Sequence, residues 1–224
     1  MHIYRCNLTL YDYLFFATTE RGKIAETGRF IHNYALTYAL GWASSPYFNE
    51  RQQPHYREEL SAARGVYVTP AQFLGGGYLL TQYNTMPETF DLSRAQSIGY
   101  PNWGFIKCLK PDSRFRFYVL SQGERAFPRF VRLGKFMSKA KLMTQHTVGT
   151  RRRGKCQVEP LLNWEDLLAP KPVPRDIIVN ALPTRLVGCS AFSMVDYVEA
   201  DFDGDSVCLP LTMGYLGDAP CNSW

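Results

Sequence analysis

Short stretches of strand-forming residues, separated by glycine and proline, recur along most of this 224-residue chain and limit the folds that it can adopt. β-branched and aromatic residues favour extended backbone, and Gly and Pro mark the turns between such runs. The stretches that we interpret as strands are 2–10, 114–120, 129–133, 142–148, 157–161, 177–180, 194–200 and 206–209.

One early segment has a clear helical period instead. Aromatic residues recur every four positions from Phe30 to Tyr38, and Gly41 is a natural stop, so we predict a largely buried helix over 30–41. Weaker signals predict two further short helices, at 55–64 and, after a capping Asn163, at 164–168. A strand, a helix and then many strands predict an α+β fold with a mostly antiparallel sheet.

Glycines and prolines are dense between residues 70 and 105, where eight of them occur. This density predicts a loop-rich insertion over 70–105, made of loops and short strands, that protrudes from the core. Pro170, Pro172 and Pro174 predict a stiff connector. No internal repeat is present, and we interpret residues 1–224 as a single domain.

Hydrophobic residues make up 46% of the chain, enough to fill a core, yet they never form a run long enough for a transmembrane helix. The first residues lack the pattern of a signal peptide, so we expect a mature start and no membrane contact. The six cysteines are scattered without a CxxC pair. We therefore expect core thiols in a reducing cytoplasm, with no metal site and no cofactor.

Charge is strongly segregated along the chain. Residues 1–106 carry eight basic and eight acidic residues, whereas the basic block, 107–155, carries fourteen basic and two acidic ones. Residues 156–224 form an acidic, β-rich C-terminal part with three basic and ten acidic residues.

Aromatic residues such as Phe115, Phe117 and Tyr118 are interleaved with the charges of the basic block. Lys and Arg can neutralise phosphates while aromatic faces stack on unpaired bases, so the block predicts binding of RNA or single-stranded DNA. The same charges could instead dock an acidic protein partner or simply solvate one face.

The stretch 149–156 (GTRRRGKC) nearly matches a phosphate-binding loop, but Cys156 stands where a hydroxyl should hold magnesium. Pro160 also follows too soon for the helix that such a loop must open. We interpret the stretch as a flexible basic hairpin tip between two strands.

Asp201, Asp203 and Asp205 alternate in the string DFDGD, which also occurs in the magnesium loop of multisubunit RNA polymerases. Alternate carboxylates share a strand face, so a hard cation is one reading. An Asp-Gly hairpin turn between two strands is the reading that we favour.

His32 lies on the apolar side of the predicted helix, which favours a buried, hydrogen-bonded histidine over a general base. His146 lies in the basic block, where RNA contact and a plain surface position are both open.

Two blocks carry a family resemblance: residues 3–41, and residues 130–142 (FVRLGKFMSKAKL). Together they resemble the "Cas five"-type subunit of type I-D CRISPR surveillance (Cascade) complexes, also called the Csc-one family. The resemblance implies a ferredoxin-like (RRM-like) core of the repeat-associated (RAMP) superfamily. It also implies a thumb-like hairpin, for which 144–157 or the glycine-rich insertion are candidates.

The resemblance further implies that the chain binds the 5′ handle of a guide crRNA. Its neighbours would be the large subunit and the backbone subunit of the type I-D complex, through which it would meet target nucleic acid. Relatives that cut precursor RNA use an adjacent Lys-His pair, whereas Gln145 precedes His146 here. We therefore expect a non-catalytic subunit.

The residues that we expect to bind RNA lie in the basic block, and they are Lys135, Lys139, Lys141, His146, Arg151, Arg152, Arg153 and Lys155. Their expected role is phosphate neutralisation, which gives affinity more than sequence choice. Two alternatives remain: an endoribonuclease that processes precursor crRNA with His32 or His146 as general base, and a module that binds only protein.

Overall fold

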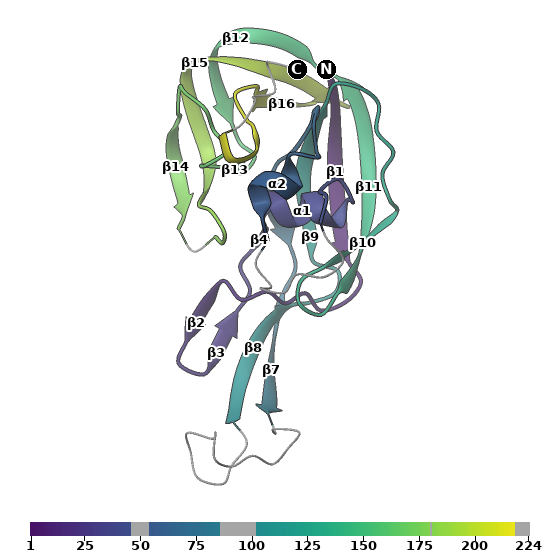
Figure 1. The fold of residues 1–224 in the computed structure, drawn as a ribbon, viewed down its shortest axis with the longest axis vertical. Coiled ribbons are helices and arrows are strands. Elements are labelled where there is room, and N and C mark those ends of the chain that lie inside the picture. The colour runs from purple at the N-terminus through teal and green to yellow at the C-terminus, as the bar shows by residue number, and fades with distance from the viewer. Residues whose placement is uncertain (46–53, 86–101, 180, 218–224) are drawn as a thin grey trace.

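The computed structural model describes residues 1–45, 54–85, 102–179 and 181–217. Within them the backbone is mostly antiparallel β-sheet (Figure 1). The helical elements are short, and they are α1 (Asn33–Ala39), α2 (Tyr56–Leu60) and the single 3₁₀ turn η2 (Tyr215–Gly217). No helix in this part of the chain is long and apolar enough to cross a membrane.

A seven-stranded sheet forms the centre of the fold, in the order β10-β11-β1-β9-β6-β4, with β5 also paired to β9. Its strands are β1 (His2–Leu10), β4 (Phe30–Ile31), β5 (Val66–Val68), β6 (Ala71–Gly75), β9 (Arg114–Ser121), β10 (Phe130–Leu133) and β11 (Ser138–Val148). The first strand is thus held between two strands that lie more than a hundred residues later in the chain.

A second sheet is organised around one long strand, β15, which pairs with each of the other four. Its strands are β12 (Thr150–Val158), β13 (Leu162–Asn163), β14 (Val173–Ile178), β15 (Leu186–Phe202) and β16 (Asp205–Pro210). The third sheet has the order β2-β3-β8-β7, from β2 (Thr19–Arg21), β3 (Ile24–Glu26), β7 (Tyr78–Thr85) and β8 (Asn102–Leu109). Strands β3 and β8 are parallel, and β7 and β8 extend away from the body (Figure 1).

Each face of the central sheet is covered differently. The face that carries Cys6 and Leu8 packs in one buried cluster against Leu36 of α1 and Leu40, the residue that follows the helix. The opposite face is covered at one end only, where Ile3, Tyr118 and Leu120 share a buried cluster with the second sheet. Burial of each such side chain contributes roughly 1.5–3 kcal/mol, so the two clusters fix the second sheet over one end of the central sheet.

The predicted helix over 30–41 is too long at its start. Phe30 and Ile31 pair with β6 as a strand, and α1 begins after an extended His32 whose ring accepts a hydrogen bond from Tyr34 N. The predicted stop at Gly41 is confirmed by its φ of +76° and by paired hydrogen bonds from Gly41 N to Tyr38 O and from Trp42 N to Thr37 O. This arrangement is a Schellman motif, which satisfies the last carbonyl groups of the helix.

The described part of the predicted insertion over 70–105 consists mostly of β6, β7 and the start of β8, so strands take the place of most of the expected loops; residues 86–101 lie outside the described residues. The glycines that suggested loops instead permit close packing. Gly76 has a φ of +143°, and a Cβ there would lie 2.3 Å from Ser113 Oγ.

Two smaller predictions also fail. Residues 164–168 form a turn instead of a helix. Asn163 Oδ1 accepts a hydrogen bond from Glu165 N, and Leu167 then forms an isolated antiparallel β-bridge with Met213. Pro174 lies inside β14 instead of a stiff connector, which an edge strand tolerates because it needs no donor on its outer side.

A buried polar network joins the second sheet to α1 and β5, and Asp166 is its centre. One carboxylate oxygen of Asp166 accepts from Tyr34 Oη (2.7 Å) and Leu216 N (2.9 Å). The other accepts from Asn33 Nδ2 (2.7 Å) and Tyr67 Oη (2.8 Å). Because four donors from different parts of the chain converge on one side chain, the network fixes how these parts sit together.

We predict that Asp166→Asn lowers the free energy of unfolding at neutral pH by about 2 kcal/mol. The amide would point its own N–H groups at buried donors and leave them unsatisfied. Urea unfolding measures the change, and Asp176→Asn, at an exposed position of β14, is the control, with an expected change within about 0.5 kcal/mol. Equal stability of Asp166→Asn and the wild type would contradict this role.

Burial raises the pKa of the Asp166 carboxyl from 3.8 to about 6, although its four donors act in the opposite direction. The folded state therefore holds this proton at pH values where the unfolded state has lost it, so protonation stabilises the fold. We predict that the stability advantage of wild type over Asp166→Asn shrinks as pH rises from about 4 to about 6 and is level above that. Urea unfolding of both proteins across this range tests the sign, and an advantage that grows with pH would contradict it.

Candidate nucleic-acid interface

One face of the central sheet is strongly basic. Strands β1, β9, β10 and β11 contain no acidic residue. Their Lys and Arg residues are Arg5, Arg114, Arg116, Arg132, Lys139 and Lys141. The pairing register places all six on the same face, because each of them alternates with an inward-facing neighbour.

The exposed part of this face, which we call the open sheet face, is the part that the second sheet leaves accessible. It consists of Asn7, Thr9, Gln72, Arg114, Arg116, Phe130, Arg132, Lys139, Lys141 and Met143. Cross-strand neighbours line up in rows, such as Phe130, Lys141, Thr9 and Arg114. The face therefore combines cations with polar groups that can donate or accept hydrogen bonds.

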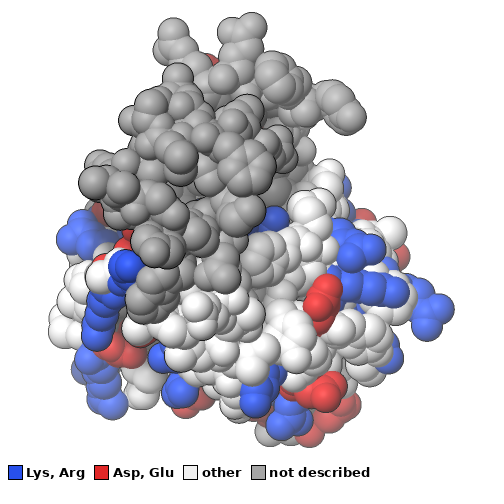
Figure 2. Space-filling view, turned by 90° about the horizontal axis from the view of Figure 1, so that it is seen from below, with Lys and Arg blue, Asp and Glu red and all other residues white. Residues whose placement is uncertain are grey.

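Two exposed apolar side chains lie among these charges. Phe130 stands beside Lys139, whose ammonium group is 4.1 Å from the ring centre, and Met143 is 60% exposed. Seen from below in Figure 2, basic side chains lie toward the margins of the molecule with uncharged surface between them. Cations around exposed aromatic and apolar groups suit a ligand that has both phosphates and bases.

The structure brings together only some of the residues predicted to bind RNA. Lys139 and Lys141 lie side by side on the open sheet face, and Lys135 is exposed in the turn that joins β10 to β11. His146 pairs with Tyr4, which places it on the opposite face. There its ring stacks on Tyr4 at 4.7 Å and its Nε2 lies 2.9 Å from His2 Nδ1.

Arg151, Arg152, Arg153 and Lys155 lie elsewhere, on strand β12 of the second sheet. The predicted hairpin tip at 149–156 is wrong, because β11 and β12 belong to different sheets and do not pair with each other. Gly149 serves close packing instead of a turn: a Cβ there would lie 2.3 Å from Val198 Cγ2.

Acidic residues of β15 offset half of the charge on β12. Arg152 Nε lies 2.7 Å from Glu199 Oε2, and Arg153 Nε lies 3.7 Å from Asp196 Oδ1, its cross-strand partner. The basic block and the acidic C-terminal part thus meet in one ladder. Net positive potential is therefore weaker on β12 than on the open sheet face.

The string DFDGD forms a hairpin, as predicted. Phe202 pairs with Asp205 across a two-residue turn in which Asp203 (φ +57°) and Gly204 (φ +87°) are both left-handed, the arrangement typical of a type I′ turn. Gly204 N donates to Asp201 Oδ1 at 3.0 Å. In the described part of the chain, no group of three His, Cys, Asp or Glu is placed to hold a metal ion.

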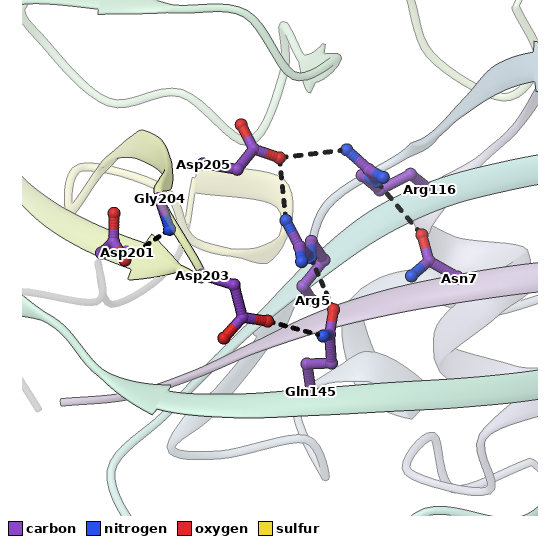
Figure 3. A network of polar contacts seen from close by, with 8 residues as sticks. All are labelled: Arg5, Asn7, Arg116, Gln145, Asp201, Asp203, Gly204 and Asp205. Carbon is purple, nitrogen blue, oxygen red and sulfur yellow. Dashed lines mark hydrogen bonds and ion pairs between the residues drawn. The ribbon is translucent and has the colours of Figure 1, made fainter.

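The tip of this hairpin rests on the covered end of the basic face (Figure 3). Asp205 Oδ2 lies 2.8 Å from Arg5 NH1 and 3.4 Å from Arg116 NH1. Asp203 Oδ2 accepts from Gln145 Nε2 at 3.2 Å. The hairpin therefore marks the boundary of the open sheet face.

His32 is buried and fully engaged, which confirms the interpretation that we favoured. Its Nδ1 accepts from Tyr34 N (3.3 Å), and its Nε2 lies 2.9 Å from Thr184 Oγ1. Burial lowers the pKa of His32 to about 4, so the ring is neutral near pH 7. It lines an apolar cavity of about 370 Å³ together with aromatic residues that include Phe16, Tyr38 and Tyr56.

Besides Lys139 and Lys141, which are among the residues predicted to bind RNA, five of the ten residues of the open sheet face could have been found by sequence pattern. Arg114 and Arg116 alternate with buried phenylalanines, and Asn7 and Thr9 alternate with leucines, which is the signature of a half-buried strand. Arg132 also alternates with apolar residues in 130–133. Arg5, by contrast, is the one Lys or Arg in 2–10. Only the pairing register shows that it lies on the basic face of the sheet, beside the open sheet face.

A protein family matches nearly the whole chain. The family described as "Type I-D CRISPR-associated protein Cas5/Csc1" matches residues 1–218. No curated protein was found that is similar to the chain.

Several solved structures are similar to it, and two of them are CRISPR proteins. One is a CRISPR protein from Archaeoglobus fulgidus (TM-score 0.49, 12% identity, 94% of this chain and 100% of that one). The other is a chain of the type III-B Cmr-beta complex bound to cognate target RNA and AMPPnP (TM-score 0.45, 11% identity, 91% of this chain and 86% of that one). Because the family match spans nearly the whole sequence, the resemblance seen in 3–41 and 130–142 is confirmed, and the chain belongs to the type I-D CRISPR-associated Cas5/Csc1 family.

Proposed function

We propose that this chain is a non-catalytic subunit of the type I-D surveillance complex and that its open sheet face binds the backbone of the guide crRNA at the 5′ handle. The observation that carries this proposal is the placement of every Lys and Arg of β1, β9, β10 and β11 on one face, with no acidic residue in those strands. Phosphate contacts of this kind give affinity and position the RNA without reading its sequence.

The geometry of the face supports an extended ligand. Alternate residues of a strand lie roughly 6–7 Å apart and neighbouring strands about 5 Å apart, so the cations form rows across the sheet. Phe130 and Met143 are exposed within these rows, where a base can stack or pack. A single-stranded segment that crosses the strands would meet phosphate-binding and base-stacking groups in turn.

We further propose that the chain bridges the large and backbone subunits and meets target nucleic acid only through the complex. The hairpin of β7 and β8 is our candidate for the thumb-like element, and the central sheet with α1 for the ferredoxin-like core. Leu80 and Tyr83 are exposed on β7, which suits contact with a neighbouring subunit. Free, buried Cys6, Cys108 and Cys156 suit a reducing cytoplasm.

A non-catalytic role is supported by the surroundings of the two histidines considered as general bases. Both ring nitrogens of His32 are engaged inside the protein. His146 shares a hydrogen bond with His2 and stacks on Tyr4, on the face opposite to the basic rows. Neither ring is placed beside the cations that would hold an RNA phosphate.

Strand β12 is the second candidate surface, for RNA or for an acidic protein partner. Arg151 and Lys155 are exposed there, and the described strands pair with β12 on one side only. A protein-only role for the chain would use this surface and leave the open sheet face without a ligand.

We predict that Lys139→Gln with Lys141→Gln weakens binding of handle RNA and lowers the salt slope of the affinity by about 1.4, since each lost phosphate contact removes about 0.7 for single strands. Fluorescence anisotropy over a series of salt concentrations measures the slope. Arg151→Gln with Lys155→Gln removes the same charge from β12 and serves as the matched variant, with little expected change.

If the substitutions at Arg151 and Lys155 weaken RNA binding and those at Lys139 and Lys141 do not, the RNA interface lies on β12. If neither pair of substitutions changes binding, phosphate contact by both surfaces is excluded, and the protein-only alternative gains support.

We also predict that the purified chain yields no specific cleavage product from repeat RNA, with or without a chelator, because neither His32 nor His146 is placed as a free base beside the basic rows. Gel analysis of end-labelled RNA tests this directly. A defined product that persists with chelator and disappears in His146→Ala or His32→Ala would establish the endoribonuclease alternative.

A further inference from the structure

Two arginines of the central sheet converge on a single carboxylate oxygen. Arg5 of β1 and Arg116 of β9 both direct NH1 at Asp205 Oδ2, at 2.8 Å and 3.4 Å (Figure 3). Each guanidinium is also held by a neighbouring amide: Arg5 Nε donates to Gln145 Oε1 (2.8 Å), and Arg116 Nε donates to Asn7 Oδ1 (3.1 Å). The two cations are thus pre-oriented by the sheet itself, whether or not Asp205 is in place.

The carboxylate is held far less firmly than the arginines. The side chain of Asp205 is 60% exposed, whereas those of Arg5 and Arg116 are 10% and 32% exposed. Ion pairs with an exposed partner contribute little to stability, typically below about 1 kcal/mol. Asp205 can therefore rotate into solvent at a small cost.

The side chain of Asp205 can rotate into solvent while the backbone of the hairpin stays on the sheet. Phe202 is buried and lies against Arg5, whose guanidinium carbon is 4.8 Å from the ring centre, and it also packs near Tyr118. The backbone of the hairpin is therefore anchored while its charged tip is free to turn. The position between Arg5 and Arg116 would then open toward the row that contains Asn7 and Met143.

We propose that Arg5 and Arg116 form a phosphate-binding position at the boundary of the open sheet face, and that the carboxylate of Asp205 occupies it until an RNA backbone phosphate replaces it. A carboxylate and a phosphate offer the same anionic oxygens to a guanidinium group. This inference rests on the proposed function, since the RNA must first lie on the open sheet face. Asp205 is then an internal competitor, which an RNA phosphate must displace before it can bind between the two arginines.

The test is Asp205→Asn in the full chain, with a labelled oligouridine of about 15 nucleotides as the probe. We expect the affinity to rise roughly three- to tenfold at low salt, because two weak ion pairs no longer oppose the phosphate. The salt slope should rise by up to about 0.7, the value of one phosphate contact, to the extent that Asp205 keeps the phosphate out of this position in the wild type.

Asp201→Asn is the matched control within the same hairpin. It removes the same charge, and its amide oxygen can still accept from Gly204 N. Among the described residues, Asp201 is not an ion-pair or hydrogen-bond partner of Arg5 or Arg116. We therefore expect the affinity to change by less than about twofold, from screened long-range charge alone.

A second variant secures the interpretation. Arg116→Gln keeps the side-chain stem at a partly exposed position, and thermal unfolding checks that it folds. In Asp205→Asn with Arg116→Gln, the gain in affinity and the rise in slope should both disappear.

An unchanged or weaker affinity of Asp205→Asn, or an equal gain in Asp201→Asn, overturns the inference. These outcomes leave the proposed function intact as long as the Lys139 and Lys141 substitutions still weaken binding. If those substitutions have no effect, the open sheet face fails as the interface, and the inference that rests on it fails as well.

Discussion

The register of β1 between β9 and β11 is the constraint on which the rest of the structure depends. Because side chains alternate along a strand, a slip of β1 by one residue would turn Arg5, Asn7 and Thr9 toward the core and move Cys6 and Leu8 to the other face. Cys6 and Leu8 fix the register by packing against α1 on the other face. The same pairing that buries the core therefore assembles the basic face.

The long strand β15 gives the acidic C-terminal part a structural role. It carries Asp196 and Glu199 to the arginines of β12, and its terminal hairpin carries Asp205 to Arg5 and Arg116. The network around Asp166 ties this second sheet to α1 and β5 and so fixes where the hairpin lies. Charges that are separated in the sequence are thus partly neutralised within the molecule, whereas Arg114, Arg132, Lys139 and Lys141 of the open sheet face make no ion pair with another described residue.

The sequence by itself determined the local structure wherever a side-chain pattern sufficed. Strand β1 matches the predicted 2–10, the stop of α1 lies at Gly41, and DFDGD forms the expected Asp-Gly hairpin, because each depends on neighbouring residues alone. The two blocks at 3–41 and 130–142 also identified the family. In 139–142, lysines alternate with the buried Ala140 and Leu142, and these lysines are part of the open sheet face.

Only the tertiary structure decided which charges lie together. Lys139 and Lys141 lie on the same face as Arg5, Arg114 and Arg116, which come from strands that are distant in sequence. Arg151–Arg153 lie in a different sheet. Neither strand partner nor sheet membership is encoded in composition, because pairing depends on long-range hydrogen bonds and on which faces bury apolar area. A count of charge along the chain therefore identified the basic block, and the fold divided it into an exposed face and a ladder of ion pairs.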